Sequence, residues 1–211
     1  RLPDIGLRRQ EDRQRYGMLK LLTGLLTGEG VIRVGGAPLR RDTLRAVRRR
    51  LGLVLQNAEQ QMFMPTVHED LVFGPLNYGL TREEAEARAD AALSQLGIAA
   101  LKERRNHSLS VGERRMAAIA VVLAMEPEAI LMDEPTAALD PRNRRRVIEV
   151  IRGLRQTRLV ASHDLDMVLD TCARVVLLSD GAVAADGAAE TVLRDRALLE
   201  AHGLELPLRL Q

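Results

Sequence analysis

Two adjacent carboxylates could support metal and acid–base chemistry. Asp133 and Glu134 directly follow the apolar run Ala129 to Met132 and precede Pro135. A carboxylate at a strand end can hold Mg²⁺ beside a phosphate, and a neighbouring carboxylate can orient or deprotonate an attacking water. The alternative is an acidic turn that only closes the strand.

Three other signals could contribute to the same chemistry. Gln56 and His163 each end a short apolar strand, and Ser110, Gly112 and Glu113 open a helix. A helix N-terminus suits a phosphate, although a Ser–Glu capping box explains the same residues. His163 could contact a γ-phosphate or order a water, or it could be structural. Because ligands bind at strand ends of parallel α/β sheets, we expect these residues to converge.

The elements that must position these side chains alternate along the chain. Apolar runs predict strands, periodic segments predict helices, and Asp180-Gly181 predicts a hairpin turn. The segment 57–80 is rich in Gly, Pro and Asn and is expected to be loop with short helical pieces. The predicted strands are 30–34, 51–55, 129–132, 159–161 and the hairpin strands 174–178 and 182–185. The predicted helices are 82–96, 111–125, 143–154 and 164–172, and 18–26 is expected to be the end of a further helix. This order predicts an α/β fold with a mostly parallel sheet.

Composition narrows the classes of function. The 211 residues fit one domain, and 31 Lys+Arg against 29 Asp+Glu leave a net charge of +2, which does not favour nucleic acid. Aromatic residues make up 2% of the chain, too few for base stacking. The single cysteine, Cys172, excludes an internal disulfide and indicates a reducing compartment. The longest apolar run, 117–125, is too short to span a membrane.

Taken together, these residues resemble the nucleotide-binding domain of an ATP-binding cassette (ABC) transporter, from about Met18 to the C-terminus. The matching segments are the Q-loop at Gln56, the signature motif at 109–113, Walker B at 129–134, the D-loop at 138–140 and the switch histidine His163. The resemblance implies a P-loop NTPase-like fold in a single domain, residues 1–211. It also implies an inserted α-helical subdomain at about 66–125.

The segments around these motifs are similar to the ATPases of energy-coupling-factor importers, especially the cobalt/nickel type. They are Gln56–Phe63, Pro65–Val67, Glu69–Asp70, Phe73–Pro75, Asp133–Pro141 and Leu198–Pro207. This resemblance implies an ATPase bound peripherally at the cytoplasmic face of the membrane. Its partners would be transmembrane subunits, contacted by 56–75, and a second ATP-binding subunit in a homo- or heterodimer.

The resemblance also implies a role for each motif residue. Glu134 would act as general base and His163 would position the γ-phosphate, whereas Asp133 and Gln56 would support Mg²⁺. The residues that would contact ATP are Gln56, Ser110, Gly112, Glu113 and Asp140, with the signature residues acting on the opposite subunit's nucleotide.

One expected motif is absent. The P-loop pattern G-x-x-x-x-G-K-[ST] should cover Arg9 to Gly17, but no glycine lies in the loop proper. Arg15 falls at the lysine position and Tyr16 at the hydroxyl position. The strands expected upstream are missing as well, so the N-terminal part is expected to be truncated or degenerate.

Two explanations of this gap compete. The chain could be a degenerate, non-hydrolysing subunit that scaffolds a partner ATPase, or the sequence could carry a local frameshift. The similarity fails abruptly between Leu7 and Met18 and then resumes in register. Read one base later, Arg13 to Tyr16 can encode Gly-Lys-x-Thr. Loss of function during evolution would be expected to alter all of the motifs, whereas only the P-loop is altered. We therefore favour a local frameshift in the sequence, and resequencing of the gene decides between the two explanations.

Overall fold

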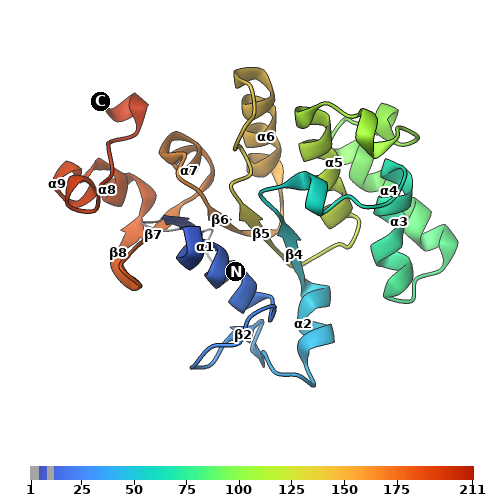
Figure 1. The fold of residues 1–211 in the computed structure, drawn as a ribbon, viewed down its shortest axis with the longest axis horizontal. Helices are drawn as coiled ribbons and strands as arrows, with labels where there is room; N and C mark the ends of the chain where they lie inside the picture. The colour runs from blue at the N-terminus through green and yellow to red at the C-terminus, as the bar shows by residue number, and fades with distance from the viewer. Residues whose placement is uncertain (1–4, 9–11) are drawn as a thin grey trace.

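A six-stranded sheet forms the centre of the protein (Figure 1). The computed structural model describes residues 5–8 and 12–211. The strand order is β4-β5-β6-β1-β7-β8, with the first five strands parallel and β8 antiparallel to β7. The bounds are β1 Ile5–Arg8, β4 Leu51–Val54, β5 Ala129–Asp133, β6 Thr157–Ala161, β7 Arg174–Ser179 and β8 Ala182–Ala188. The predicted mostly parallel α/β sheet is confirmed.

Helices surround this sheet, and three of them gather at one end (Figure 1). These three are α3 Val67–Asn77, α4 Arg82–Gln95 and α5 Val111–Leu123, which pack on one another. The others are α1 Asp12–Leu22, α2 Leu44–Arg50, α6 Pro141–Gly153, α7 Leu165–Thr171, α8 Ala189–Arg194 and α9 Arg196–Ala201. No helix in the described part of the chain is both long enough and apolar enough to cross a membrane.

Alternation along the strands divides the core between the two faces of the sheet. Leu131 and Ala161 pack against Leu19 of α1, whereas their neighbours Met132 and Val160 belong to the larger cluster on the opposite face. Successive side chains of a strand point to opposite faces, so a strand covered on both faces must be apolar throughout. This explains why the central strands read as continuous apolar runs.

The expectation of a loop over most of 57–80 is wrong, because α3 occupies Val67–Asn77. Thr66 begins the helix with a capping box, in which Thr66 Oγ1 accepts the Glu69 N–H and Glu69 Oε2 accepts the Thr66 N–H. Gly74 permits a close approach to the segment that follows α5, since a Cβ there would lie 2.4 Å from Met125 Sδ. Gly74 and Pro75 therefore lie inside a helix.

Strand β1 lies between β6 and β7 in the sheet. Of the positions expected for the P-loop, 9–11 lie outside the described residues, whereas 12–17 form the first part of α1. The strand predicted at 30–34 is shorter than expected. Only Arg33–Val34 form β2, which pairs with β3, Ala37–Pro38.

Candidate active site at the strand ends

The parallel register brings three of the predicted site segments to one edge of the sheet. Val54 of β4 is paired with Met132 of β5, which is paired with Val160 of β6. The residues that follow these pairs therefore leave the sheet together. They are Gln56, the Asp133–Glu134 pair and the Ser162–His163 pair.

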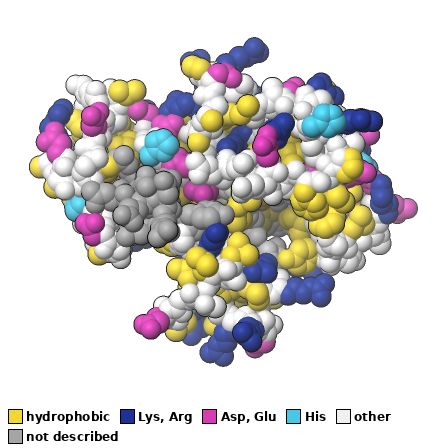
Figure 2. All heavy atoms as spheres, viewed as in Figure 1, with side chains coloured by type: hydrophobic (Ala, Val, Ile, Leu, Met, Phe, Trp, Pro, Cys, Tyr) yellow, Lys and Arg dark blue, Asp and Glu magenta, His cyan; other side chains and the backbone are white. Residues whose placement is uncertain are grey.

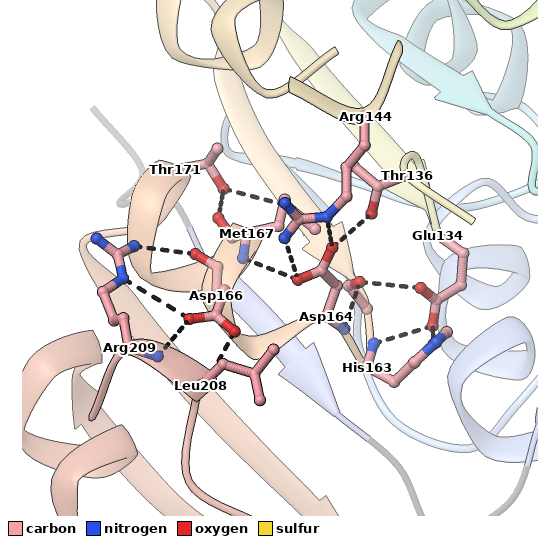
Figure 3. A network of polar contacts seen from close by, with 11 residues as sticks. Glu134, Thr136, Arg144, His163, Asp164, Asp166, Met167, Thr171, Leu208 and Arg209 are labelled. Atoms are coloured by element: carbon pink, nitrogen blue, oxygen red, sulfur yellow. Dashed lines mark hydrogen bonds and ion pairs between the residues drawn. The ribbon is translucent and has the colours of Figure 1, made fainter. Parts of the chain in front are cut away.

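Glu134 accepts several polar contacts at this edge, at one end of the network drawn in Figure 3. Its side chain is 1% exposed, and its backbone takes a left-handed conformation with φ of 44°. Ser162 Oγ donates to Oε2 at 2.9 Å, and the His163 N–H donates to Oε1 at 3.0 Å. His163 Nδ1 lies 2.7 Å from the same Oε1. The two predicted catalytic residues are thus in direct contact.

Asp164 connects this pair to α6 and α7 (Figure 3). Its carboxylate accepts two bonds from Arg144, both at 2.7 Å, and one from Thr136 Oγ1 at 3.1 Å. It also caps α7 by accepting the Met167 N–H at 3.0 Å. Burial opposes ionisation, but Arg144 and the Met167 amide outweigh it and lower the pKa of Asp164.

The Asp164 backbone completes a chain of contacts to Glu134. Its N–H donates to Ser162 Oγ at 3.1 Å, and that hydroxyl in turn donates to Glu134. Ser162 is fully buried, so it has few other geometries available. The position of the Glu134 carboxylate therefore depends on Asp164 and on Arg144.

Asp133 and Gln56 differ in their surroundings. Asp133 is 3% exposed at the end of β5, whereas Gln56 is exposed after β4. Arg115 lies near Asp133: burial lowers the pKa of Arg115, and the Asp133 charge partly offsets that effect. Among residues 5–8 and 12–211, no cluster of three or more His, Cys, Asp or Glu could enclose a metal.

Asp133 and Gln56 fit Mg²⁺ better than a metal that is enclosed by protein ligands alone. Mg²⁺ prefers oxygen ligands and is commonly held by one or two carboxylates together with substrate phosphates. The Asp133 carboxylate and the Gln56 amide oxygen supply hard oxygen donors at the same edge of the sheet. The residues present are therefore compatible with a Mg²⁺ ion that arrives with a phosphate substrate.

The predicted signature residues form the N-terminus of α5. The capping box is confirmed, because Ser110 Oγ accepts the Glu113 N–H at 3.3 Å and Glu113 Oε2 accepts the Ser110 N–H at 2.8 Å. This capping lowers the pKa of Glu113. Ser110 and Val111 are exposed, whereas Gly112 is buried.

Gly112 brings this helix end against the first turn of α6, which directly follows the predicted D-loop. A Cβ at Gly112 would lie 2.3 Å from Asn143 Cγ, so only glycine fits without a shift. Asn143 in turn donates to Asp140 Oδ2 at 2.5 Å, and Asp140 caps α6 by accepting the Arg142 and Asn143 amides. A hollow of about 320 Å³ lies between the predicted Q-loop, signature and D-loop motifs. Its lining includes one residue from each of them: Gln56, Val111 and Ala138.

Four residues that contact the site had no role in the sequence interpretation. They are Ser162, Asp164, Arg144 and Arg115. Ser162 and Asp164 flank His163, so their position at a strand end was a usable signal. Arg144 and Arg115 had none, because they reach the site from helices that are distant in the sequence.

Comparisons with known proteins agree on one family. The family model described as ABC transporter matches residues 17–137. A Gloeobacter violaceus protein, named provisionally as an ABC transporter ATP-binding protein, is 52% identical over 188 residues, covering 88% of this chain and 77% of that protein. The cobalt import ATP-binding protein CbiO of Rhodobacter capsulatus is 47% identical, covering 76% and 59%. The energy-coupling factor transporter ATP-binding protein EcfA of Carboxydothermus hydrogenoformans is 38% identical, covering 90% and 72%.

Solved structures give the same result for the fold. CbiO1 from Clostridium perfringens, described as part of the ABC transporter complex CbiONQ, has a TM-score of 0.82 at 30% identity, covering 97% of this chain and 84% of that one. A dimeric ATP-binding cassette bound to ADP and Pi has a TM-score of 0.77 at 24% identity, covering 89% and 85%. The predicted P-loop NTPase-like fold is confirmed by these similarities. The chain therefore belongs to the ABC transporter family, as an ATP-binding subunit.

Proposed function

We propose that this chain is the ATP-binding and ATP-hydrolysing subunit of an energy-coupling-factor importer for cobalt, nickel or a similar micronutrient. Similarity to CbiO and EcfA supports the importer class. The single observation that carries hydrolysis is the buried Glu134 carboxylate held by Ser162 and His163 at the strand ends. In this proposal the whole chain is one nucleotide-binding domain, with residues 66–125 as its helical subdomain.

Glu134 is the proposed general base. Its Oε1 and Oε2 accept hydrogen bonds from the chain, which fixes the carboxylate that would orient a water and take its proton. The His163 ring is 63% exposed, so it can contact both Glu134 and a γ-phosphate. Bound Mg²⁺, held by Asp133 and Gln56, would neutralise phosphate charge.

The exposed start of α5 supports a role in a dimer. Ser110 and Val111 are accessible to a second ATP-binding subunit, and the Gly112 amide lies in the first turn of the helix. The N-terminus of a helix favours a phosphate through its free N–H groups. In this arrangement Ser110, Gly112 and Glu113 contact the nucleotide of the opposite subunit, and Asp140 lies beside them at the interface.

The proposed contact with transmembrane subunits lies on the segment 56–75. Phe63 is 63% exposed and Phe73 is 38% exposed, and their rings meet edge to face at 5.0 Å. Figure 2 shows hydrophobic side chains gathered on the face over α3 and the segment before it. A neighbouring hollow of about 470 Å³ is lined by Met62, Met64 and His107, among others. Docking here would place the chain at the cytoplasmic face of the membrane.

The test is ATP turnover by the chain assembled with its membrane subunits. Glu134→Gln should lower turnover by at least about 100-fold while ATP binding is kept, because the base is lost but the shape is retained. Glu149→Gln, on the exposed side of α6, is the matched control and should retain turnover. Unchanged turnover in Glu134→Gln would refute the proposed base.

A second candidate is favoured by the sequence between Arg9 and Gly17, which lacks the P-loop residues. In that case the chain scaffolds a partner ATPase, lends it the Ser110 helix end and holds no nucleotide. Equilibrium binding of Mg-ATP to the isolated chain separates the candidates. Micromolar binding supports the hydrolysing subunit, whereas no binding at millimolar Mg-ATP supports the scaffold.

A further inference from the structure

Arg115 is a buried arginine that bonds to backbone rather than to a carboxylate. It is 4% exposed in α5, and its Nη1 donates to the Leu55 carbonyl at 2.7 Å. Its Nη2 donates to the Gln56 carbonyl at 2.5 Å, and its Nε has no hydrogen-bond partner. Burying a guanidinium is costly unless it is well paired, so this placement needs an explanation.

A second side chain joins the same two elements. The Leu55 N–H donates to Gln61 Oε1 at 3.0 Å, and Gln61 Nε2 donates to the Ala118 carbonyl of α5 at 2.7 Å. Both backbone groups of Leu55 are therefore held by side chains that are tied to α5. The segment between β4 and α3 is thus anchored to the helix that begins with the signature residues.

The position of Arg115 places it between two parts of the proposed site. Ser110 lies five residues earlier, at the start of the same helix, and Gln56 is held directly through its carbonyl. Asp133 is close enough for its charge to act on the guanidinium. A displacement of the helix start would therefore be passed to Gln56 through Arg115.

We propose that Arg115 is a positioning residue that couples the signature end of α5 to Gln56 and so sets the Mg²⁺ dependence of the site. This inference rests on the proposed function, because Gln56 is assigned to Mg²⁺ there. Arg115 contacts neither substrate nor metal in this scheme. It acts through the backbone of Leu55 and Gln56.

The test compares Arg115→Met and Arg115→Lys in the chain assembled with its membrane subunits. Arg115→Met should raise the Mg²⁺ concentration for half-maximal ATP turnover at least fivefold, with less than a twofold change in KM for ATP at saturating Mg²⁺. Arg115→Lys should restore part of this loss, because an ammonium can still donate to one of the two carbonyls.

Arg158→Met is the matched control. Arg158 also donates to backbone carbonyls, those of Ile151 and Leu154, but it lies near the start of β6, away from the strand ends that carry the site. It should destabilise the fold without moving the Mg²⁺ midpoint. An equal shift in both variants, or none in Arg115→Met, would overturn the proposal.

Amide hydrogen exchange provides a readout that does not need activity. In Arg115→Met, the amides of 55–61 should exchange at least tenfold faster than in the wild type, whereas Arg158→Met should leave them unchanged. Wild-type protein without ATP turnover would refute the proposed function alone, and the exchange measurement would still decide the anchoring. Unchanged exchange at 55–61 would refute Arg115 as the anchor.

Discussion

Asp164→Ala tests the contacts that the Asp164 side chain makes beside the site. The substitution removes one carboxylate that performs three tasks: it pairs with Arg144, it accepts the Thr136 hydroxyl and it caps α7. The Asp164 side chain is 19% exposed and that of Arg144 is 35% exposed, so the pair is partly shielded from solvent. The effect on the free energy of unfolding can be worked out task by task.

Loss of an N-cap costs about 1 kcal/mol. A partly buried bidentate Arg–carboxylate pair contributes about 1 kcal/mol to stability. This is more than an exposed pair contributes and well below the cost of breaking a fully buried one. The hydroxyl of Thr136, which is 6% exposed, loses its acceptor at a cost of about 1 kcal/mol. We therefore expect Asp164→Ala to lower the free energy of unfolding by about 3 kcal/mol, on the basis of these three contributions.

Urea unfolding followed by circular dichroism measures this change. Asp164→Asn should lose only about 1 kcal/mol, because asparagine still caps the helix and accepts from Thr136. Asp195→Ala provides the matched control: Asp195 caps α9 through the Leu198 amide but has no arginine among its described contacts, so the loss should be about 1 kcal/mol. If Asp164→Ala lowers the free energy of unfolding by no more than Asp195→Ala does, the stabilising contacts assigned to Asp164 with Arg144 and Thr136 are wrong.

Three further predictions concern the same region. The pKa of Asp164 is lowered on folding, so its stabilisation is present above the unfolded pKa of about 3.9 and is lost as pH falls through the folded value. The difference in unfolding free energy between wild type and Asp164→Asn should therefore shrink below about pH 4 in acid titrations. Gly112→Ala should cost about 1–3 kcal/mol in urea unfolding, because its Cβ displaces Asn143, whereas Gly153→Ala, with open space at its Cβ, should cost nothing. Ser110→Ala should cost about 1 kcal/mol by the same measurement, and a loss below about 0.3 kcal/mol would contradict the observed cap.

The sequence was sufficient to predict that the site residues meet at one edge of the sheet. The segments 51–54, 129–132 and 159–161 of β4, β5 and β6 are apolar or glycine on both faces, so they were visible as runs. The strand ends near Gln56, Asp133 and His163 could therefore be placed. Parallel pairing then brings these ends together without further information. The capping box at Ser110 was equally visible, because its signal is local.

Other features were out of reach because they depend on contacts between distant segments. Helix α3 was overlooked because Gly74 and Pro75 are helix breakers in isolation, and the close approach of Met125 that requires glycine exists only in the folded chain. From the sequence alone, Arg115 and Arg144 would be expected to face solvent, as arginines of helices usually do. Their bonds to Gln56 and Asp164 follow from tertiary packing alone.

Backbone strain at the end of β5 explains why the contact chain is needed. Glu134 and Ala138 both have left-handed backbones, with φ of 44° and 60°, which costs roughly 1–2 kcal/mol for each non-glycine residue. At Glu134 this conformation ends the alternation of the strand and places the carboxylate across the end of β6, where Ser162 and His163 bond it. Such strain persists only where surrounding contacts over-determine it. The bonds from Ser162 and His163, together with the Glu134 N–H donated to the Ala161 carbonyl at 2.8 Å, supply that constraint.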